Sequence, residues 1–110
     1  MFPKSNKLSS DEFSRLYANG FRVKGQFGVL ISSVSPYPKY RVGFVVNKKV
    51  GNAVVRHQTT RHIRNVFRKI VGEYNLPLLY EYIAYTPISD LNAFEDEFKS
   101  QMDKVHEHFN

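Results

Sequence analysis

The sequence predicts a single α+β domain in which helices pack on a small β-sheet, and three observations support this prediction. The chain has 110 residues and 42% hydrophobic content, enough for one ordinary domain over residues 1–110 but not for two. Segments with the 3.6-residue period of helices are separated by β-branched and aromatic segments typical of strands. The sequence contains no cysteine, which excludes disulfides, thiolate metal sites and thiol catalysis.

The first helix is predicted to begin near Ser9 and to end at Gly20. Ser9 and Glu12 have the spacing of a capping box, although Ser10 is an equally good cap. Glycine is common just beyond the end of a helix, where it stops the helical run. One face of this helix would carry Phe13, Leu16 and Tyr17.

Three segments are predicted to form strands because β-branched and aromatic residues dominate them. Residues 21–34 read as one strand in which Gly25 and Gly28 provide bends or bulges. A proline-containing turn leads into a return strand at 40–46, and the third strand covers 78–85.

Two further helices are predicted, one from 52 to 71 and one from 90 to 109. The first of them stops at Gly72. The second has an apolar stripe formed by Leu91, Phe94, Phe98, Met102 and Val105. The predicted element order is therefore α-β-β-α-β-α.

The net charge of +6 is distributed unevenly along the chain. Residues 39–72 contain nine lysine and arginine residues and no acidic residue, whereas residues 73–110 contain eight acidic and two basic residues. A solvated helix face normally mixes the two signs, because like charges four residues apart oppose helix formation. The basic segment therefore predicts a polyanionic partner, and a basic surface with no binding role is the alternative.

The predicted helix at 52–71 separates its basic side chains from its apolar ones. At ~100° per residue, Val66, Phe67 and Ile70 fall on one buried face. Arg56 and Thr60 project toward the same side, so Arg56 either lies past the edge of the core or enters a groove between helix and sheet. The other basic side chains form a separate stripe, whose spacing suits a row of phosphates: His57, Arg61, Arg64 and Arg68. The alternative is that the arginines of this stripe pair with carboxylates of the last helix.

The stretch Lys48-Lys49-Val50-Gly51-Asn52-Ala53-Val54-Val55-Arg56 resembles the signature of the bacterial ribonuclease P protein family, which leads into an arginine-rich helix. The predicted first helix and the strand at 40–46 also fit, so the resemblance covers nearly the whole chain. Within the helix, Arg56, Arg61 and Arg64 match the family pattern. The departures, at positions where the family favours asparagine, arginine and lysine, are His57, Gln58 and Thr60.

The resemblance implies a small subunit of a ribonucleoprotein endonuclease that removes the 5′ leader from precursor tRNA. It implies that the RNA subunit and its Mg²⁺ ions hydrolyse the phosphodiester bond, with no catalytic residue in this chain. It also implies a left-handed strand–helix–strand crossover, although about 98% of such connections are right-handed. The sequence itself agrees with a non-catalytic role, because residues 39–72 lack the carboxylates that a metal-dependent protein nuclease needs.

By the same resemblance, two surfaces of the chain bind RNA. The surface for the catalytic RNA comprises Lys48, Lys49, Arg56, His57, Arg61, Arg64 and Arg68. The cleft for the precursor tRNA leader comprises Phe13, Tyr17, Val29, Ile31, Arg56 and Thr60. Ile31 stands where relatives carry a tyrosine, and aromatic side chains in this cleft would stack on unpaired bases. Without the resemblance, Phe13 and Tyr17 are more typical of an ordinary core.

Two other functions stay open: a ribosomal or other structural RNA-binding protein, and a free-standing protein nuclease. A histidine acid–base pair is not predicted, because His57 and His62 lie ~140° apart on their helix. No segment approaches the ~20 apolar residues of a membrane span, and the N-terminus lacks the apolar region of a signal peptide. We therefore expect a soluble, cytoplasmic protein with no membrane partner and no small-molecule substrate.

Overall fold

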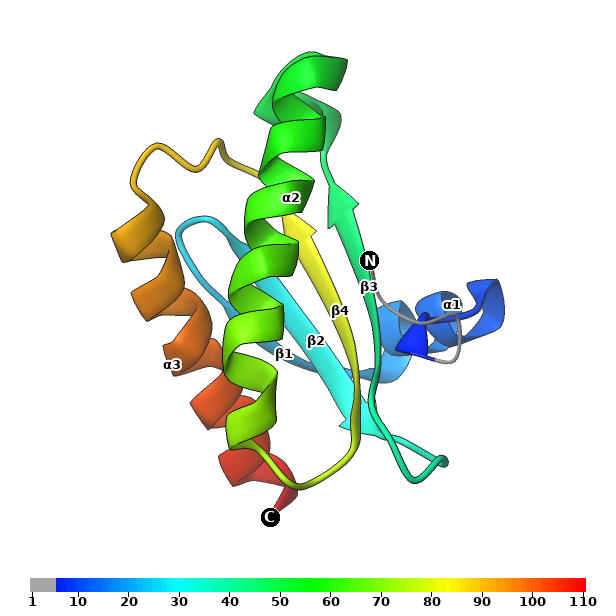
Figure 1. Cartoon of the computed structure of the whole chain (residues 1–110). Helices are drawn as coiled ribbons and strands as arrows, with labels where there is room; N and C mark the ends of the chain where they lie inside the picture. Colours follow the sequence, from blue (N-terminus) through cyan, green and yellow to red (C-terminus); the bar gives the residue numbers. More distant parts are fainter. Residues whose placement is uncertain (1–5) are drawn as a thin grey trace.

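The computed structural model describes residues 6–110, which form three α-helices and one four-stranded β-sheet (Figure 1). Short 3₁₀ helices flank α2, with η2 (Lys48–Val50) before it and η3 (Val71–Glu73) after it. The α+β class and all three predicted helices are confirmed. The main elements follow in the order α1 (Ser10–Asn19), β1 (Phe21–Lys24), β2 (Gly28–Val34), β3 (Arg41–Val46), α2 (Ala53–Ile70), β4 (Leu78–Ala84) and α3 (Leu91–Phe109).

The segment predicted as one bent strand is a hairpin of two strands. β1 pairs antiparallel with β2, with Val23 opposite Leu30. The Gly25 N–H donates to the carbonyl of Gly28 over 2.9 Å and closes the turn between the strands. The predicted order α-β-β-α-β-α is therefore wrong by one strand, and the observed order is α-β-β-β-α-β-α.

The strand predicted to return beside its predecessor pairs elsewhere. β3 runs parallel to β4, and β4 runs antiparallel to β2, so the strand order across the sheet is β1-β2-β4-β3. β3 is thus an edge strand. Among the described residues, its outer side carries one β-bridge, between Lys7 and Val42.

The connection from β3 through α2 to β4 is left-handed. In Figure 1 both strands point upward, α2 lies in front of the sheet, and the chain passes from β3 to β4 on its left. A right-handed connection with the helix in front would pass to the right instead. The crossover predicted from the resemblance is confirmed.

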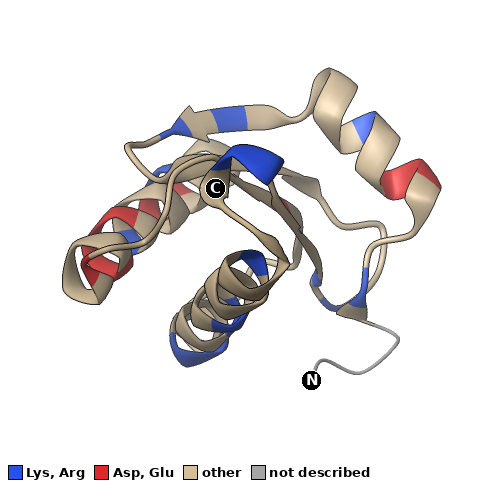
Figure 2. Ribbon diagram, turned by 90° about the horizontal axis from the view of Figure 1, so that it is seen from above, with Lys and Arg blue, Asp and Glu red and all other residues tan. Residues whose placement is uncertain are grey.

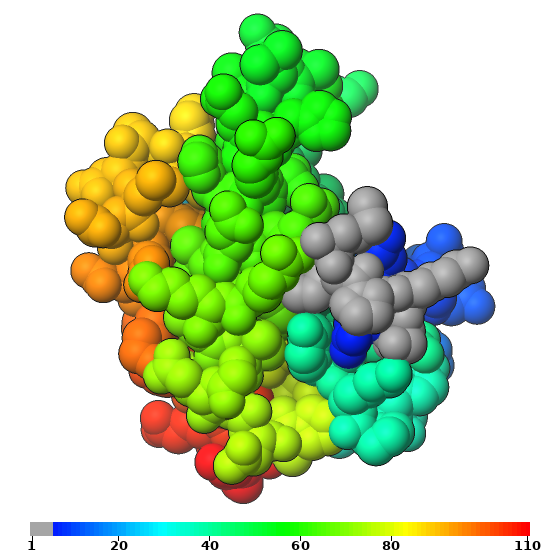
Figure 3. Space-filling model, viewed as in Figure 1, coloured from blue at the N-terminus to red at the C-terminus, as the bar shows by residue number. Residues whose placement is uncertain are grey.

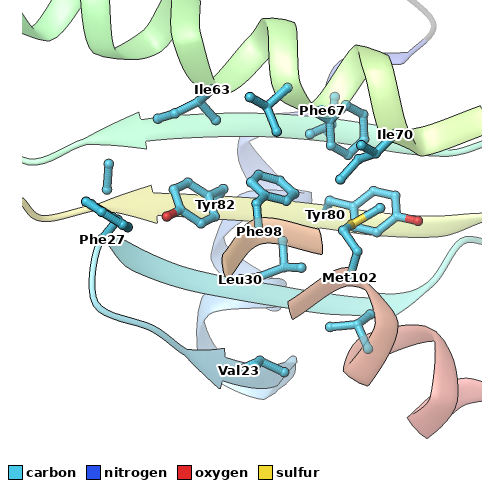
Figure 4. Close-up of a cluster of buried hydrophobic side chains, with 14 of the residues drawn as sticks. Val23, Phe27, Leu30, Ile63, Phe67, Ile70, Tyr80, Tyr82, Phe98 and Met102 are labelled. Carbon is cyan, nitrogen blue, oxygen red and sulfur yellow. The ribbon is translucent and has the colours of Figure 1, made fainter. Parts of the chain in front are cut away.

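Helices cover both faces of the sheet, with α2 and α3 on one face and α1 on the other (Figures 1 and 2). The larger core lies beneath α2 and α3, where aromatic rings from the helices meet rings from β4 (Figure 4). Tyr82 stacks on Phe98 with ring centroids 5.0 Å apart, and Phe67 packs edge-on against Tyr80 at 5.2 Å. The predicted apolar stripe of α3 is buried except for Leu91, which is half exposed.

The smaller core lies beneath α1, and the predicted capping box fixes the start of that helix. The Ser9 hydroxyl accepts from the Glu12 N–H at 3.2 Å, and the Glu12 carboxylate accepts from the Ser9 N–H at 2.8 Å. Gly20 follows the helix in an extended conformation, so it is needed for space: a Cβ there would lie 2.5 Å from Ile31 Cγ2. The buried residues of this core are Leu8, Leu16, Val29, Ile31 and Leu79.

Candidate nucleic-acid interface

The segment that leads into α2 is held by two asparagine side chains. Asn47 Oδ1 accepts from the Lys49 N–H at 2.9 Å, and Asn52 Oδ1 accepts from the Val55 N–H at 3.0 Å. Between them Gly51 has a φ of 155°, a conformation that residues with a side chain rarely adopt. This fixed bend exposes the two lysines of η2, and Figure 3 shows the bend and the start of α2 standing clear of the rest of the molecule.

α2 carries basic charge without acidic charge, and it lies beside the acidic helix α3 (Figure 2). Arg61 is exposed and Arg64 half-buried, and neither pairs with a carboxylate within residues 6–110. Two ion pairs next to α3 use lysines: Lys69 lies 3.0 Å from Glu95, and Lys99 lies 2.8 Å from Glu73. The alternative in which α3 neutralises the arginines therefore fails for Arg61 and Arg64.

Arg56 enters a groove, which decides between the two placements left open by the sequence. Its side chain is half-buried and lines a depression of about 320 Å³ at the start of α2, together with Val46, His57 and Thr60. The Thr60 hydroxyl donates to the Arg56 carbonyl at 3.0 Å. Within the described chain, the buried Nε of Arg56 has no hydrogen-bond partner, so this donor is available to a ligand.

Arg64 lines a depression at the edge of the sheet, whereas it was predicted to point away from the sheet. The helical wheel places it with Arg61, directed away from the sheet. The structure instead places Arg64 in a depression of about 200 Å³ at the edge of the sheet, where Phe13, Gly43 and Phe44 are also part of the lining. The reason is that β3 is an edge strand, so the surface beside it extends further round α2 than a wheel can indicate.

A third depression, of about 490 Å³, lies between α1 and the sheet; we call it the α1 groove. It is lined by Phe13, Ser14, Tyr17, Val45 and Glu81. Tyr17 is 58% exposed, so it is not a core residue, and its ring lies 4.7 Å from the guanidinium carbon of Arg22. Phe13 is half-buried and lines both this groove and the depression that contains Arg64.

Two residues predicted for the leader cleft are buried beneath α1. Val29 is 8% exposed and Ile31 is fully buried, and both belong to the smaller core. Strand alternation directs them to the correct face of the sheet, but α1 covers that part of the face. Ile31 therefore presents no surface to a ligand, and its assignment to the cleft is wrong; Val29 is nearly as inaccessible.

A buried ion pair attaches α1 to β3. Arg41 Nη1 lies 3.2 Å from the carboxylate of Glu12, which is 2% exposed, and the Arg41 guanidinium stacks over the ring of Tyr37. Burial alone would raise the pKa of Glu12, but hydrogen bonds from the Ser9 N–H, Tyr37 and Arg41 outweigh it and lower the pKa. The carboxylate therefore stays ionised and holds the wall of the α1 groove in place.

Glu81 also lines the α1 groove, and the sequence did not predict it as a site residue. It lies on β4, opposite Ile31 of β2 and Gly43 of β3, and is 4% exposed. Burial raises the pKa of its carboxyl group, and the charge of Arg22 partly opposes this effect. The signal was present, since an acidic residue interrupts the apolar strand Leu78–Ala84 at a position that alternation directs toward α1.

Within residues 6–110, no group of three or more histidine, aspartate or glutamate side chains is placed to hold a metal ion. Over the same range, no helix is sufficiently long and apolar to cross a lipid bilayer.

Comparisons with known proteins agree with this geometry. The family model described as Ribonuclease P matches residues 2–109. The ribonuclease P protein component of Halalkalibacterium halodurans is 39% identical over 87 residues, covering 74% of this chain and 70% of the relative. The corresponding protein of a Geobacillus species is 32% identical over 93 residues, covering 84% and 77%. The solved structure of the Staphylococcus aureus RNase P protein superposes with a TM-score of 0.79 at 26% identity, over 94% of this chain and 99% of that one. The chain belongs to the ribonuclease P protein family.

Proposed function

We propose that this chain is the protein subunit of a ribonuclease P holoenzyme and binds two RNAs, the catalytic RNA of the enzyme and the 5′ leader of precursor tRNA. One observation carries the proposal: η2 and α2 form a projecting surface rich in basic side chains and free of carboxylates. Such a surface attracts the phosphates of a structured RNA. It comprises Lys48, Lys49, His57, Arg61, Arg64 and Arg68, with Arg56 at its edge.

The 5′ leader, which is single-stranded, occupies the α1 groove and the adjoining edge of β3. Phe13 and Tyr17 offer aromatic surface to unpaired bases, and Arg56, Arg64 and Thr60 line the neighbouring depressions. Base stacking on aromatic side chains contributes about 1–3 kcal/mol per base and tolerates different sequences. This combination suits a leader whose sequence varies from one tRNA to another.

Hydrolysis of the phosphodiester bond belongs to the RNA subunit in this proposal, with Mg²⁺ ions held mainly by that RNA. Metal ions in such reactions activate the attacking water and stabilise the leaving oxygen. Residues 39–72, which supply most of the proposed RNA surface, contain no carboxylate that could share in binding these ions. The role of the protein is therefore to bind and to orient the substrate.

Reconstitution separates this proposal from the two other functions. The chain is mixed with precursor tRNA in Mg²⁺ buffer, with and without ribonuclease P RNA, under conditions where the RNA alone cleaves poorly. Cleavage that requires both components supports the proposal. Cleavage by the chain alone would identify a protein nuclease, and an RNA whose activity the chain does not alter would favour a structural RNA-binding protein.

The salt dependence of RNA binding tests the basic surface. If about six basic groups neutralise phosphates, the slope of log K against log salt concentration should be near −5. Changing Arg61 and Arg64 to alanine should make this slope less steep by about 2. Changing Lys99 and Lys104 of α3 to alanine removes the same charge from another surface and should leave the slope unchanged. Equal slopes for the two double variants would contradict the assignment.

Tyr17→Ala tests the leader site separately. Loss of one stacked base should weaken binding of a leader-bearing precursor tRNA by about 1–3 kcal/mol, with little effect on mature tRNA or on assembly with the RNA subunit. Because Tyr17 is 58% exposed, thermal stability should change little. Leu91→Ala, an exposed residue of α3, is the control and should change neither affinity. Equal losses for both tRNAs with Tyr17→Ala would place the leader elsewhere.

A further inference from the structure

The floor of the α1 groove contains a carboxylate that the proposed function does not use. Glu81 contributes to the groove lining between Phe13, Tyr17 and Val45, although only 4% of the residue is exposed. A charged floor is unexpected in a groove proposed to hold RNA, because carboxylates repel phosphates. A carboxylate at this position suits a specific hydrogen bond to a ligand and does not suit general attraction of the RNA backbone.

The carboxylate of Glu81 has no donor of its own. Its Oε1 is buried without a hydrogen-bond partner, and residues 6–110 give the side chain no hydrogen bond or ion pair. Arg22 lies two strands away in the same cross-strand row, but its Nη2 donates to the carbonyl of Tyr17. A buried acceptor left unpaired is destabilising, and a ligand with an N–H group would offset that cost.

The surroundings of Glu81 favour a nucleobase over other ligands. Apart from Ser14, the groove walls are the aromatic and aliphatic side chains of Phe13, Tyr17 and Val45, and flat uncharged rings pack well against such surfaces. The carboxylate excludes the phosphate of a nucleotide but accepts from neutral N–H donors, as acidic side chains do with the amino group of cytosine. One base inserted edge-on between Phe13 and Tyr17 would present its donors to Glu81.

We propose that Glu81 is a specificity-determining residue that accepts a hydrogen bond from the amino group of one leader base, so that the α1 groove prefers adenine, cytosine or guanine to uracil. The proposal rests on the proposed function, since it assumes that the leader enters this groove. Uracil has no amino group, and its single ring N–H is flanked by two carbonyl oxygens. These oxygens would face the Glu81 carboxylate and be repelled by it. The structure thus assigns base discrimination to a position where stacking alone would give none.

The test measures binding of precursor tRNAs by the reconstituted holoenzyme while each leader position in turn carries one of the four bases. At one position the wild-type holoenzyme should bind an amino-bearing base about tenfold more tightly than uracil, equivalent to about 1.4 kcal/mol. Glu81→Gln should reduce this preference to about twofold or less, because an amide both donates and accepts. Glu107→Gln, on the exposed surface of α3, is the matched control and should retain the full preference.

A second variant keeps the inference testable if the first folds poorly. Glu81→Leu fills the same space without a polar group, so it should abolish base preference while unfolding at the same or a higher temperature than the wild type. Preference that persists in both variants would overturn the inference. So would a change in Mg²⁺ dependence without any change in base preference, which would identify a cation site.

The inference and the proposed function fail in different ways. If the leader increases the affinity over mature tRNA but no position discriminates against uracil, Glu81 does not read a base and the proposed function stands. If the leader adds no affinity in the wild-type holoenzyme, the proposed leader site itself is wrong.

Discussion

Gly43→Ala is expected to displace the aromatic wall shared by the two depressions beside β3. A Cβ at Gly43 would lie 2.6 Å from Cε1 and 2.9 Å from Cε2 of Phe13, whereas unstrained carbon atoms stay about 3.5–4.0 Å apart. Cζ of the same ring is closer still and would overlap the new Cβ, so the ring must move by roughly 1.5 Å or tilt away from the sheet. The backbone of Gly43 has no positive φ, so this steric contact is the whole perturbation.

Overpacking of this kind costs about 1–3 kcal/mol. For a chain of this length the corresponding drop in melting temperature is about 4–12 °C, measured by circular dichroism or calorimetry. Gly72→Ala is the matched control, because a Cβ there meets nothing within 4 Å and the stability should change by less than about 0.5 kcal/mol. Leader binding should weaken in Gly43→Ala but not in Gly72→Ala, since Phe13 lines both the α1 groove and the depression that contains Arg64.

A double-mutant cycle tests whether the contact with the Phe13 ring causes the loss of stability in Gly43→Ala. In a Phe13→Ala background the ring is absent, so adding Gly43→Ala should cost less than about 0.5 kcal/mol, and the coupling energy should be about 1–2 kcal/mol. If Gly43→Ala destabilises equally with and without the ring, the contact between these residues is not the reason. If it is as neutral as Gly72→Ala, Phe13 is not packed against β3.

Two further predictions concern α3. Glu97 accepts hydrogen bonds at 2.6 and 2.9 Å from two backbone N–H groups of the hairpin loop 25–27, so Glu97→Ala should lower the free energy of unfolding in urea by about 1–3 kcal/mol, whereas exposed Glu107→Ala should not. Burial lowers the pKa of His106, whose Nε2 pairs with Tyr80 Oη at 2.6 Å. The unfolded chain therefore binds the proton more readily, and stability should fall as the pH drops below about 6.5. His106→Gln should flatten this pH dependence of the urea midpoint, and an equally steep profile would contradict the assignment.

The helices were predictable because their signals are local. Ser9 and Glu12 lie three residues apart and bond to each other, so the sequence contains both partners of the cap that begins α1. The apolar stripes of α2 and α3 follow the helical period, and each stripe packs on the sheet as expected. Gly20 ends α1 as predicted but for another reason, since Ile31 leaves no space for a side chain there.

The strand pairing was not predictable, because distant residues determine it. The loop between β1 and β2 is held by Glu97 and by Gln101, whose Nε2 donates to the carbonyls of Val23 and Gly28 at 2.9 and 3.0 Å. These contacts join residues more than seventy positions apart, so the glycines at 25 and 28 read as bends in one strand. The pairing of β3 with β4 likewise spans α2.

The proposed site was predictable in composition but not in detail. The basic side chains of η2 and α2 follow from the sequence alone, because no acidic residue interrupts them. The direction of Arg64 does not, since it depends on where the sheet ends. The burial of Ile31 and of Glu81 depends on the part of the sheet that α1 covers, although Glu81 is visible in the sequence as an acidic residue within an apolar strand.

The hand of the crossover connects the fold to the proposed leader site. α1 and α2 lie on opposite faces of the sheet, yet Phe13 and Arg64 line the same depression, together with Gly43 and Phe44 of β3. This is possible only around the outer edge of the sheet, where β3 pairs with no further strand among the described residues and carries the single bridge between Val42 and Lys7. With α2 on the same face, a right-handed connection would place β4 on the other side of β3, where it would cover that edge and separate Phe13 from Arg64. The left-handed connection keeps β3 at the edge, so a single RNA strand can contact both helices.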